Sequence, residues 1–354
     1  MSISFQQIHQ ISIDAAWYTQ PFKGFCLDSR KLEAGQIFIA LNSYSQPEKT
    51  RLFAENALNA GALAVISETD LGLANEWVCP EVRYLMGEWQ KQYLQVVDPV
   101  TALRGIAVTG TNGKTTISRL IAELISSQRQ GCAVMGTTGN GILPNLTPST
   151  HTTLDALQLQ NALHDYAKQG ASFVALEASS HGLEQGRLNG CELEIAVYSN
   201  LSRDHLDYHG TLEAYAEAKA LLFKFTTLKT VVINLDDAHS SLMLDAAKAN
   251  PSQPKILTYS TQQAADYQVQ QIEYSLNGVR FHLQTATAEY VVQSPLLGHF
   301  NVENLLASLI AAEQAGFALQ DLIHTTAQLK GAPGRMQVLR DAERLFVVDY
   351  AHTP

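Results

Sequence analysis

Short apolar runs separated by amphipathic stretches make up most of the chain. In the first hundred residues this pattern predicts two apolar strands, 36–41 and 62–67. Between them, residues 53–62 carry the spacing of a helix, which Gly61 is expected to end. We therefore expect a small α/β unit over residues 1–100. The segment 96–105, broken by Pro99, indicates the passage into a second domain.

The longest stretch, residues 101–337, alternates apolar strands with amphipathic helices. The predicted strands are 105–110, 132–136, 173–178, 194–200 and 230–237. Helices are predicted over 115–128 and 155–170, and the first has one apolar face, formed by Ile117, Leu120, Ile121, Leu124 and Ile125. Strands separated by helices favour an α/β fold with a mostly parallel sheet, which binds ligands beyond the carboxyl ends of its strands. Four polar or small residues stand at those ends: Gly110, Glu177, Asn200 and Asp236.

A different pattern follows. Residues 255–297 alternate polar and apolar positions, which predicts a smaller antiparallel sheet, and a helix is expected over 301–316. Residues 338–354 begin a third domain and end in the apolar run LFVVDYAHTP. Because a strand needs partners, we expect the natural protein to continue beyond this run and the chain to be a fragment.

Composition narrows the function classes. The chain has 354 residues and a formal net charge of −10, which disfavours a nucleic-acid or anionic-membrane binder. Its four cysteines lie far apart without a C-x-x-C pair, so neither a disulfide framework nor a zinc site is expected. Neither a secretory signal nor an apolar stretch of roughly 18–20 residues is found, so we expect a cytoplasmic protein without membrane insertion.

The segment TGTNGKTT (109–116) carries the strongest chemical signal. It lies between a predicted strand and a predicted helix, where backbone N–H groups of a glycine-rich turn cradle phosphates. Lys114 would reach the terminal phosphates and the Thr115 hydroxyl would bind Mg²⁺. Val108 stands at the first glycine position of the strict motif, so a turn with a chance lysine is the alternative. Because the guanine-reading N-K-x-D motif is absent, the nucleotide is expected to be ATP.

Two neighbouring segments hold further candidates. Glu177 ends a predicted strand beside this turn. It is interpreted either as a second Mg²⁺ ligand or as an ordinary solvated glutamate. The loop 179–190 follows it, and Arg187 there could clamp a carboxylate or phosphate, or only hold the loop together.

The segment 200–223 gathers histidines and carboxylates before a helix. Taken singly, Asp204 and His209 are interpreted as polar residues of a surface loop. Lys219 shares a helix face with apolar residues, and we interpret it as a lysine whose stem packs while its head reaches water. The alternative is a neutral amine that can form a carbamate with CO₂.

Taken together, the motifs resemble the Mur ligase family, and within it the members that add the third residue of the peptidoglycan stem peptide. The motifs are LDSR (27–30), GQIFIA (35–40), TGTNGKTT, LEASSHGLEQGR (176–187), RDHLDYHGT (203–211), AYAEAKALLF (214–223), GHFNVEN (298–304), GAPGRMQ (331–337) and VVDYAHTP (347–354). They run in the family's order over nearly the whole chain. TGTNGKT alone would also fit folylpolyglutamate synthases.

The resemblance implies a role for each matching residue. The UDP-linked substrate would contact Leu27, Ser29, Thr152, Thr153, Ser179, Gln185 and Arg187. ATP would contact Gly110, Thr111, Asn112, Gly113, Lys114, Thr115, Thr116, Asn301, Asn304, Arg335 and Asp349. Mg²⁺ would be held by Thr115, Glu177, His205 and a carbamylated Lys219, and the catalytic set would be Lys114, Glu177, His205 and Lys219.

The chain departs from the family pattern in places. His151 and Leu154 flank Thr152 and Thr153 where some members have Asn and Pro, and residues 42–50 lack the usual D-G-x-x-[FY]. The family's motif for the incoming amino acid lies in a further domain that this chain lacks. No residue here therefore distinguishes diaminopimelate from lysine.

The resemblance implies a monomeric, ADP-forming amide-bond ligase with a UDP-substrate domain (1–100), a P-loop ATPase domain (101–337) and the start of an amino-acid-binding domain (338–354). Its substrates would be ATP, UDP-N-acetylmuramoyl-L-alanyl-D-glutamate and a diamino acid, for which meso-diaminopimelate is favoured. An acyl phosphate would form first, and this chain alone is expected to turn over little, if at all. Two alternatives stay open: a folylpolyglutamate-type ligase, and a non-catalytic module that binds nucleotide and UDP-substrate.

Overall fold

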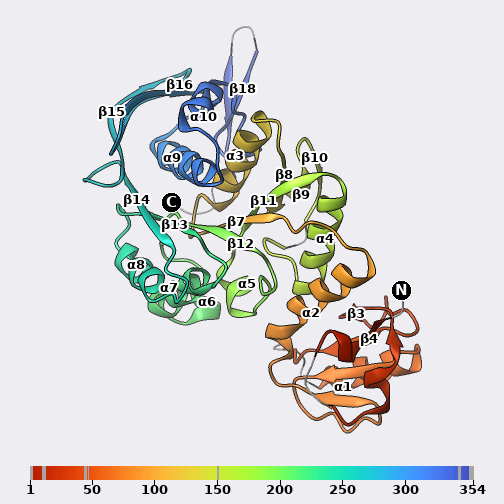
Figure 1. The fold of residues 1–354 in the computed structure, drawn as a ribbon. Coiled ribbons are helices and arrows are strands. Elements are labelled where there is room, and N and C mark those ends of the chain that lie inside the picture. Colours follow the sequence, from red (N-terminus) through yellow and green to blue (C-terminus); the bar gives the residue numbers. More distant parts are fainter. Residues whose placement is uncertain are drawn as a thin grey trace. The chain divides into compact units, whose positions relative to one another are not determined.

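The computed structural model describes residues 3–9, 13–43, 46, 48–149, 151–341 and 344–350. It divides into two compact units, coloured along the sequence in Figure 1. The first unit combines residues 1–102 with the segments 154–168 and 185–191, and the second contains the remainder. Within the described residues, none of the helices has the length and apolar character that crossing a bilayer requires.

The first unit is built on a parallel sheet in the order β3-β4-β5-β6. Its strands are β3 (Phe25–Cys26), β4 (Ile37–Ala40), β5 (Ala64–Ser67) and β6 (Glu76–Val78), with a small antiparallel pair β1 (Ile3–Ser4) and β2 (Pro21–Phe22). Its helices are α1 (Lys49–Asn59), α2 (Val82–Val97) and α4 (Ala156–Lys168), with short 3₁₀ turns η1 (Phe5–Gln7) and η2 (Ala16–Thr19). The strands predicted at 36–41 and 62–67 and the helix predicted at 53–62 are confirmed, whereas α2 was not predicted.

The second unit contains one sheet of eleven strands among the described residues, in the order β10-β9-β8-β11-β7-β12-β13-β14-β15-β16-β17. The strands are β7 (Arg104–Thr109), β8 (Gly131–Gly136), β9 (Gly139–Ile142), β10 (Asn145–Thr147), β11 (Ala171–Glu177), β12 (Leu193–Tyr198), β13 (Thr230–Asn234), β14 (Lys255–Ser260), β15 (Tyr267–Ser275), β16 (Gly278–Thr285) and β17 (Glu289–Ser294). The centre is parallel and both edges are antiparallel. The predicted α/β fold class and its strands are confirmed.

The helices predicted at 115–128 and 301–316 are confirmed, whereas several other helices of this unit were not predicted. The helices of the unit are α3 (Lys114–Ser127), α5 (Ser180–Glu184), α6 (Leu206–His209), α7 (Leu212–Ala220), α8 (Ser240–Lys248), α9 (His299–Gln314) and α10 (Leu319–Thr325), with 3₁₀ turns η3 (Leu221–Lys224) and η4 (Thr326–Gln328). The predicted apolar face of α3 is fully buried and shares one core with α9. Burying such a face removes apolar surface from water, which is the main stabilising contribution to this unit.

Two strand predictions were wrong in their pairing. Residues 255–260 form β14, which is parallel to both β13 and β15, because the parallel arrangement extends one strand further than the alternation indicated. The strand near the end, β19 (Leu345–Val348), has a partner: it pairs antiparallel with β18 (Gln337–Arg340). The expectation that this strand has no partner within the chain is therefore wrong.

The order of the strands determines where the candidate site residues lie. Strand β7 lies between β11 and β12, with Glu177 in register with Val108 and Tyr198 in register with Thr109. The glycine-rich turn after β7 therefore emerges between the loops that follow β11 and β12. The carboxyl ends of these three strands meet at one edge of the parallel sheet.

Candidate active site

The glycine-rich turn has the geometry of a phosphate-binding loop. It connects β7 to the N-terminus of α3, and Gly113 has a φ of +88°, in the left-handed region that glycine adopts readily. A Cβ at Gly113 would lie 2.5 Å from the Asn304 side-chain oxygen, so only glycine fits. The Lys114 ammonium donates hydrogen bonds to the Gly110 and Thr111 carbonyls, both at 2.8 Å.

Residues after β12 hold this turn in place. The Thr111 N–H donates to the Asn200 carbonyl at 2.8 Å, and the Asn112 N–H donates to the Asn200 side-chain oxygen at 2.9 Å. The Ser199 hydroxyl donates to the Asn112 carbonyl at 2.6 Å. These bonds fix the turn without occupying Lys114, which remains able to meet an anion.

Glu177 lies at the end of β11 and is 2 % exposed, so the interpretation of a solvated glutamate is wrong. Its carboxylate accepts hydrogen bonds from the Thr137 N–H at 2.8 Å and the Thr137 hydroxyl at 3.2 Å. A Cβ on Gly136 would come within 2.0 Å of it, so glycine there makes room for the carboxylate. Burial raises the pKa of Glu177, while Lys114 and hydrogen bonds from Thr137 and Thr115 oppose that rise.

Lys219 is also fully enclosed, at 1 % exposed, so the interpretation of a lysine head in water is wrong. Its ammonium nitrogen donates to the Gly110 carbonyl at 2.8 Å and lies 4.2 Å from the centre of the Tyr215 ring. Burial, followed by the nearby Lys114 cation, lowers the pKa of Lys219 well below its ordinary value. The neutral amine, which is the nucleophilic form, is therefore favoured.

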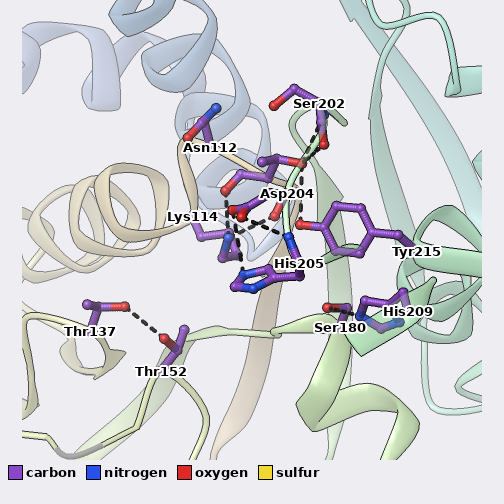
Figure 2. A network of polar contacts seen from close by, with 12 residues as sticks. Asn112, Lys114, Thr137, Thr152, Ser180, Ser202, Asp204, His205, His209 and Tyr215 are labelled. Atoms are coloured by element: carbon purple, nitrogen blue, oxygen red, sulfur yellow. Dashed lines mark hydrogen bonds and ion pairs between the residues drawn. The ribbon is translucent and has the colours of Figure 1, made fainter. Parts of the chain in front are cut away.

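Asp204 lies near Lys114 (Figure 2) and stands in a polar loop, as expected, with a side chain that is 30 % exposed. It lines the same pocket as Lys114, and its charge raises the pKa of both Lys114 and Lys219 against the effect of burial. It also accepts a hydrogen bond from the His205 N–H at 2.8 Å. Asp204 is thus a counter-charge for two buried lysines.

Aromatic and histidine rings gather beside Lys219. The His181 ring centre lies 5.2 Å from that of His205 and 5.3 Å from that of His209, and His205 has a positive φ of 52°. The His209 side chain is 1 % exposed, and its Nε2 is 2.9 Å from the Ser180 hydroxyl, so it is not the solvated loop residue that was expected. This bond joins the loop that carries His205 to the loop that follows Glu177 (Figure 2).

A pocket of about 400 Å³ opens over the glycine-rich turn. All predicted ATP residues except Gly110 and Asn301 line it. The other lining residues are Asn200, Asp204, Phe300 and Glu303. Asn301 lies beneath: it is 2 % exposed, and its side-chain oxygen accepts from the Asn304 amide at 3.1 Å. Asp349 accepts from the Met336 N–H at 3.2 Å, which ties β19 to the loop that carries Arg335.

The predicted substrate residues fall into both units. In the second unit, the Thr153 hydroxyl lies 2.8 Å from the Glu177 carbonyl and 3.0 Å from the Ser179 hydroxyl, and Thr152 lies 3.1 Å from Thr137. Thr153 and Ser179 therefore lie beside the Glu177 backbone, and Thr152 reaches the Glu177 carboxylate only through Thr137.

In the first unit, Leu27 packs partly against the core and Ser29 is half-buried in the loop after β3. The Gln185 side-chain oxygen accepts hydrogen bonds from Arg187 at 2.7 and 3.1 Å. Next to Ser29, Asp28 pairs with Arg30, which holds the pKa of Asp28 down at about 2.

Mg²⁺ prefers hard oxygen ligands, and some of the residues expected to hold it supply them. Glu177 presents a carboxylate whose pKa the Thr115 hydroxyl lowers, so the two oxygens lie close together and fit one ion. Across the described parts of the chain, no group of three His, Cys, Asp or Glu side chains is arranged to hold a metal. A second ion would therefore depend on an oxygen ligand that Lys219 acquires only when carbamylated.

Comparison with known proteins gives the family. The family model for the Mur ligase middle domain matches residues 108–312. The chain belongs to the Mur ligase family. A relative from Chromobacterium violaceum, named UDP-N-acetylmuramoyl-L-alanyl-D-glutamate--2,6-diaminopimelate ligase, is 40% identical over 342 residues, covering 94% of this chain and 68% of that protein.

Solved Mur ligases and folylpolyglutamate synthases share this fold. A structure with the same ligase name has 74% sequence identity and a TM-score of 0.95, over 100% of this chain and 72% of the other. A folylpolyglutamate synthase from L. casei gives a TM-score of 0.63 at 16% identity over 78% of this chain and 74% of its own. That distant likeness supports the fold alone.

Sequence reasoning missed several residues of the site. Thr137 stands in GTTGNG, which is not a dinucleotide-binding motif but directly follows β8, and this position was a usable signal. Asn200 was noted at a strand end without a role, and it holds the glycine-rich turn. Phe300 and Glu303 stand in the motif GHFNVEN (298–304) but were given no role, because their place in the pocket depends on how α9 packs.

Proposed function

We propose that this chain performs the ATP-dependent steps of a ligase that joins 2,6-diaminopimelate to UDP-N-acetylmuramoyl-L-alanyl-D-glutamate. The observation that carries this proposal is the pocket over the turn before α3, which Lys114 and Thr115 line, together with the buried Glu177 carboxylate that interacts with both residues. Family membership and the names of the similar ligases support the same reaction. The identity of the amino acid rests on those names alone.

Within this proposal, residues 1–100 bind the UDP end of the substrate, residues 101–337 bind ATP, and residues 338–354 begin an amino-acid-binding domain. Leu27 and Ser29 would contact the uridine, while Thr152, Thr153 and Ser179 would contact the dipeptide beside Glu177. Gln185 and Arg187 would hold the substrate's anionic groups, since a guanidinium binds carboxylate or phosphate with two hydrogen bonds.

The chemical demand of the first step is that two anions meet. The D-glutamate carboxylate attacks the γ-phosphorus of ATP, ADP leaves, and an acyl phosphate forms; the diamino acid's amine then displaces phosphate from the carbonyl. Lys114 contributes a positive charge at the terminal phosphates, and the backbone N–H groups of the turn add fixed dipoles. Burial lowers the pKa of Lys114, and the charges of Glu177 and then Asp204 oppose that fall and favour the charged ammonium.

Magnesium, when bound, neutralises phosphate charge and holds the reacting oxygens in line. Thr115 and Glu177 would hold one ion, and His205 with a carbamylated Lys219 would hold another. Carbamylation joins CO₂ to the neutral Lys219 amine with loss of one proton, which converts a cation into an oxygen ligand. The low pKa of Lys219 supports this assignment.

We also place the ligase in the cytoplasm as a monomer, in cell-wall biogenesis, on which cell shape and division depend. Its product would be a UDP-linked tripeptide. Neither a nucleic acid nor a membrane is among the proposed partners.

Nucleotide turnover tests the proposal. ADP release is measured from the chain with Mg²⁺-ATP alone, with added UDP-N-acetylmuramoyl-dipeptide, and with a folate instead. We expect slow ADP release that only the UDP-dipeptide stimulates and that Lys114→Ala abolishes. Stimulation by the folate alone would favour the folylpolyglutamate-type ligase. Binding of both ATP and UDP-dipeptide without any ADP release would favour a non-catalytic module.

A further inference from the structure

One carboxyl group in the nucleotide pocket has no role in the proposed mechanism. Glu303 lies on α9, and its side chain is 20 % exposed. Its nearest ionic partner is the Nε2 atom of His299 at 3.7 Å, and within the described residues it accepts no hydrogen bond. A carboxyl group at this depth that accepts no hydrogen bond is unusual, because buried polar groups are normally hydrogen-bonded.

The neighbouring carboxylates are fully occupied, which sets Glu303 apart. Asp237 accepts from the Tyr198 hydroxyl at 2.6 Å and the Leu201 N–H at 2.8 Å. Asp236 accepts from the Thr261 N–H at 2.7 Å and from its hydroxyl at 3.0 Å. Glu303 alone among these three carboxyl groups lines the pocket and keeps its oxygens for a ligand.

The protonation state of Glu303 decides which hydrogen-bond donors and acceptors a ligand must present to it. Burial and the charges of Asp236 and Asp237 raise the pKa of Glu303 to about 7, so the neutral acid is well populated at neutral pH. A neutral carboxyl group presents one donor and one acceptor side by side, whereas a carboxylate presents acceptors only. Adenine carries the complementary pair, a 6-amino donor next to a ring-nitrogen acceptor.

The position of Glu303 fits the base end of a nucleotide. The pocket that it lines also contains Lys114 and the turn that would hold the phosphates. Phe300 lies one helical turn before Glu303 on α9, lines the same pocket and is 49% exposed. An exposed aromatic ring beside a polar group is a common platform for a nucleic-acid base.

We propose that Glu303 recognises the adenine of ATP, with its carboxyl group paired to the 6-amino group and the adjacent ring nitrogen while Phe300 packs on the ring. This inference rests on the proposed ATP-dependent function. It adds a specificity-determining residue within GHFNVEN (298–304), where the motif itself gave Glu303 no role.

Several titratable groups face Glu303 from the surrounding elements. Asp236 and Asp237 lie after β13, Tyr259 is on β14 and Tyr274 is on β15. His299 precedes it on α9, and its Nδ1 is 2.6 Å from the Tyr274 hydroxyl. The two aspartates favour the neutral acid, whereas a protonated His299 would favour the carboxylate.

Nucleotide affinity, measured by calorimetry with Mg²⁺, tests the assignment in Glu303→Ala and Glu303→Gln. Two ligands are compared: ATP and the purine riboside triphosphate that lacks the 6-amino group. We expect Glu303→Ala to weaken ATP binding by about tenfold and to change binding of the amino-free analogue by less than about twofold. Asp245→Asn removes a carboxylate from α8 and serves as the matched control.

A pH series from about 6 to about 8.5 gives an independent readout, since glutamine offers the same donor and acceptor as a neutral carboxyl group at every pH. The ratio of wild-type to Glu303→Gln affinity should fall as pH rises through about 7, while titration of the nucleotide phosphates cancels in that ratio. This comparison also decides the matter if circular dichroism shows that Glu303→Ala does not fold.

Three results would overturn the inference. Equal losses for both nucleotides in Glu303→Ala would show that the carboxyl group does not read the 6-amino group. A flat pH ratio would show that its protonation is irrelevant. Wild-type protein that ignores ATP altogether would remove the proposed function as well, whereas tight wild-type binding with unaffected Glu303 variants would remove only this inference.

Discussion

At the residue scale, the sequence predicted those site residues whose position depends only on their immediate neighbours in the chain. Lys114 and Thr115 follow from the glycine-rich turn, whose geometry depends on a few neighbouring residues. His209 was misinterpreted, because its burial depends on Ser180, which is far away in the sequence, and the place of Asp204 in the pocket was not predicted for the same kind of reason. For Lys219 the environment also decides: burial against Tyr215 and Gly110 lowers its pKa and favours the neutral amine, which no single-residue property indicates.

The proposed carbamate on Lys219 gives a prediction of chemical rescue. Lys219→Ala should lower ADP release by at least about a hundredfold, because an oxygen ligand and a buried hydrogen bond are both lost. Adding a short carboxylic acid should restore part of the rate, since it returns a carboxylate to the vacated space. Lys224→Ala, on the adjacent 3₁₀ turn, is the control. Failure of every short acid and of CO₂ to alter the variant's rate would contradict the carbamate.

A half-buried histidine in the first unit predicts acid sensitivity. The His9 ring lies 5.1 Å from the Trp89 ring centre and 5.3 Å from that of Trp77, its Nε2 has no hydrogen-bond partner among the described residues, and burial lowers its pKa. Protonation therefore favours the unfolded state: stability is complete above the ordinary histidine pKa and is lost as pH falls below it.

Thermal unfolding from about pH 7.5 to about pH 5 should show this loss. His9→Phe keeps an aromatic ring in the cluster and should flatten the pH dependence, whereas His324→Gln at an exposed site should not. Identical pH profiles for wild type and His9→Phe would exclude His9 as the cause.

At the element scale, periodicity predicted the strands and helices but not all of their pairings. The alternation of polar and apolar residues in 255–260 is compatible with parallel or antiparallel pairing. The pairing of β14 depends on the directions of its neighbours β13 and β15, and it is parallel to both. The partner of β19 was missed because β18 is a short run within a polar stretch. The helix α2 was not predicted, because the first unit was interpreted mainly from its apolar strands.

The loop before β18 is held by α3, and this contact predicts a positioning role for Glu123. Its carboxylate accepts from the Lys330 N–H at 2.9 Å, from the Gly331 N–H at 3.3 Å and from Arg119 at 3.0 Å. The loop leads to Arg335 in the nucleotide pocket. Glu123→Ala should therefore weaken ATP binding by roughly tenfold, by leaving Arg335 poorly placed.

A double-mutant cycle measures that coupling. Arg335→Ala should weaken binding strongly in the wild type and much less in the Glu123→Ala background, because the two residues act as one unit. Glu123→Gln retains an acceptor oxygen and should recover part of the affinity. Fully additive losses would mean that Glu123 only stabilises the fold.

At the scale of the whole molecule, the sequence pattern predicted an α/β protein with a mostly parallel sheet, and family resemblance predicted its class. Local patterns could not show that the segments 154–168 and 185–191 group with the first hundred residues, because that grouping depends on tertiary contacts such as the 2.6 Å hydrogen bond between Gln90 and Asn161. The order of the strands brings the site together. Because β11, β7 and β12 are neighbours, the glycine-rich turn, Glu177 and Asn200 lie at the same edge of the sheet.

The most direct measurement of the central claim is the calorimetric affinity of the chain for Mg²⁺-ATP, with and without Lys114. A triphosphate seated on the turn of residues 110–116 predicts binding by the wild type and a loss of about a hundredfold in Lys114→Ala, because charge-assisted hydrogen bonds to phosphate disappear. Lys248→Ala, on the exposed face of α8, should bind as the wild type does. A wild-type chain that does not bind ATP with magnesium, or a Lys114→Ala variant that binds equally well, would contradict the account.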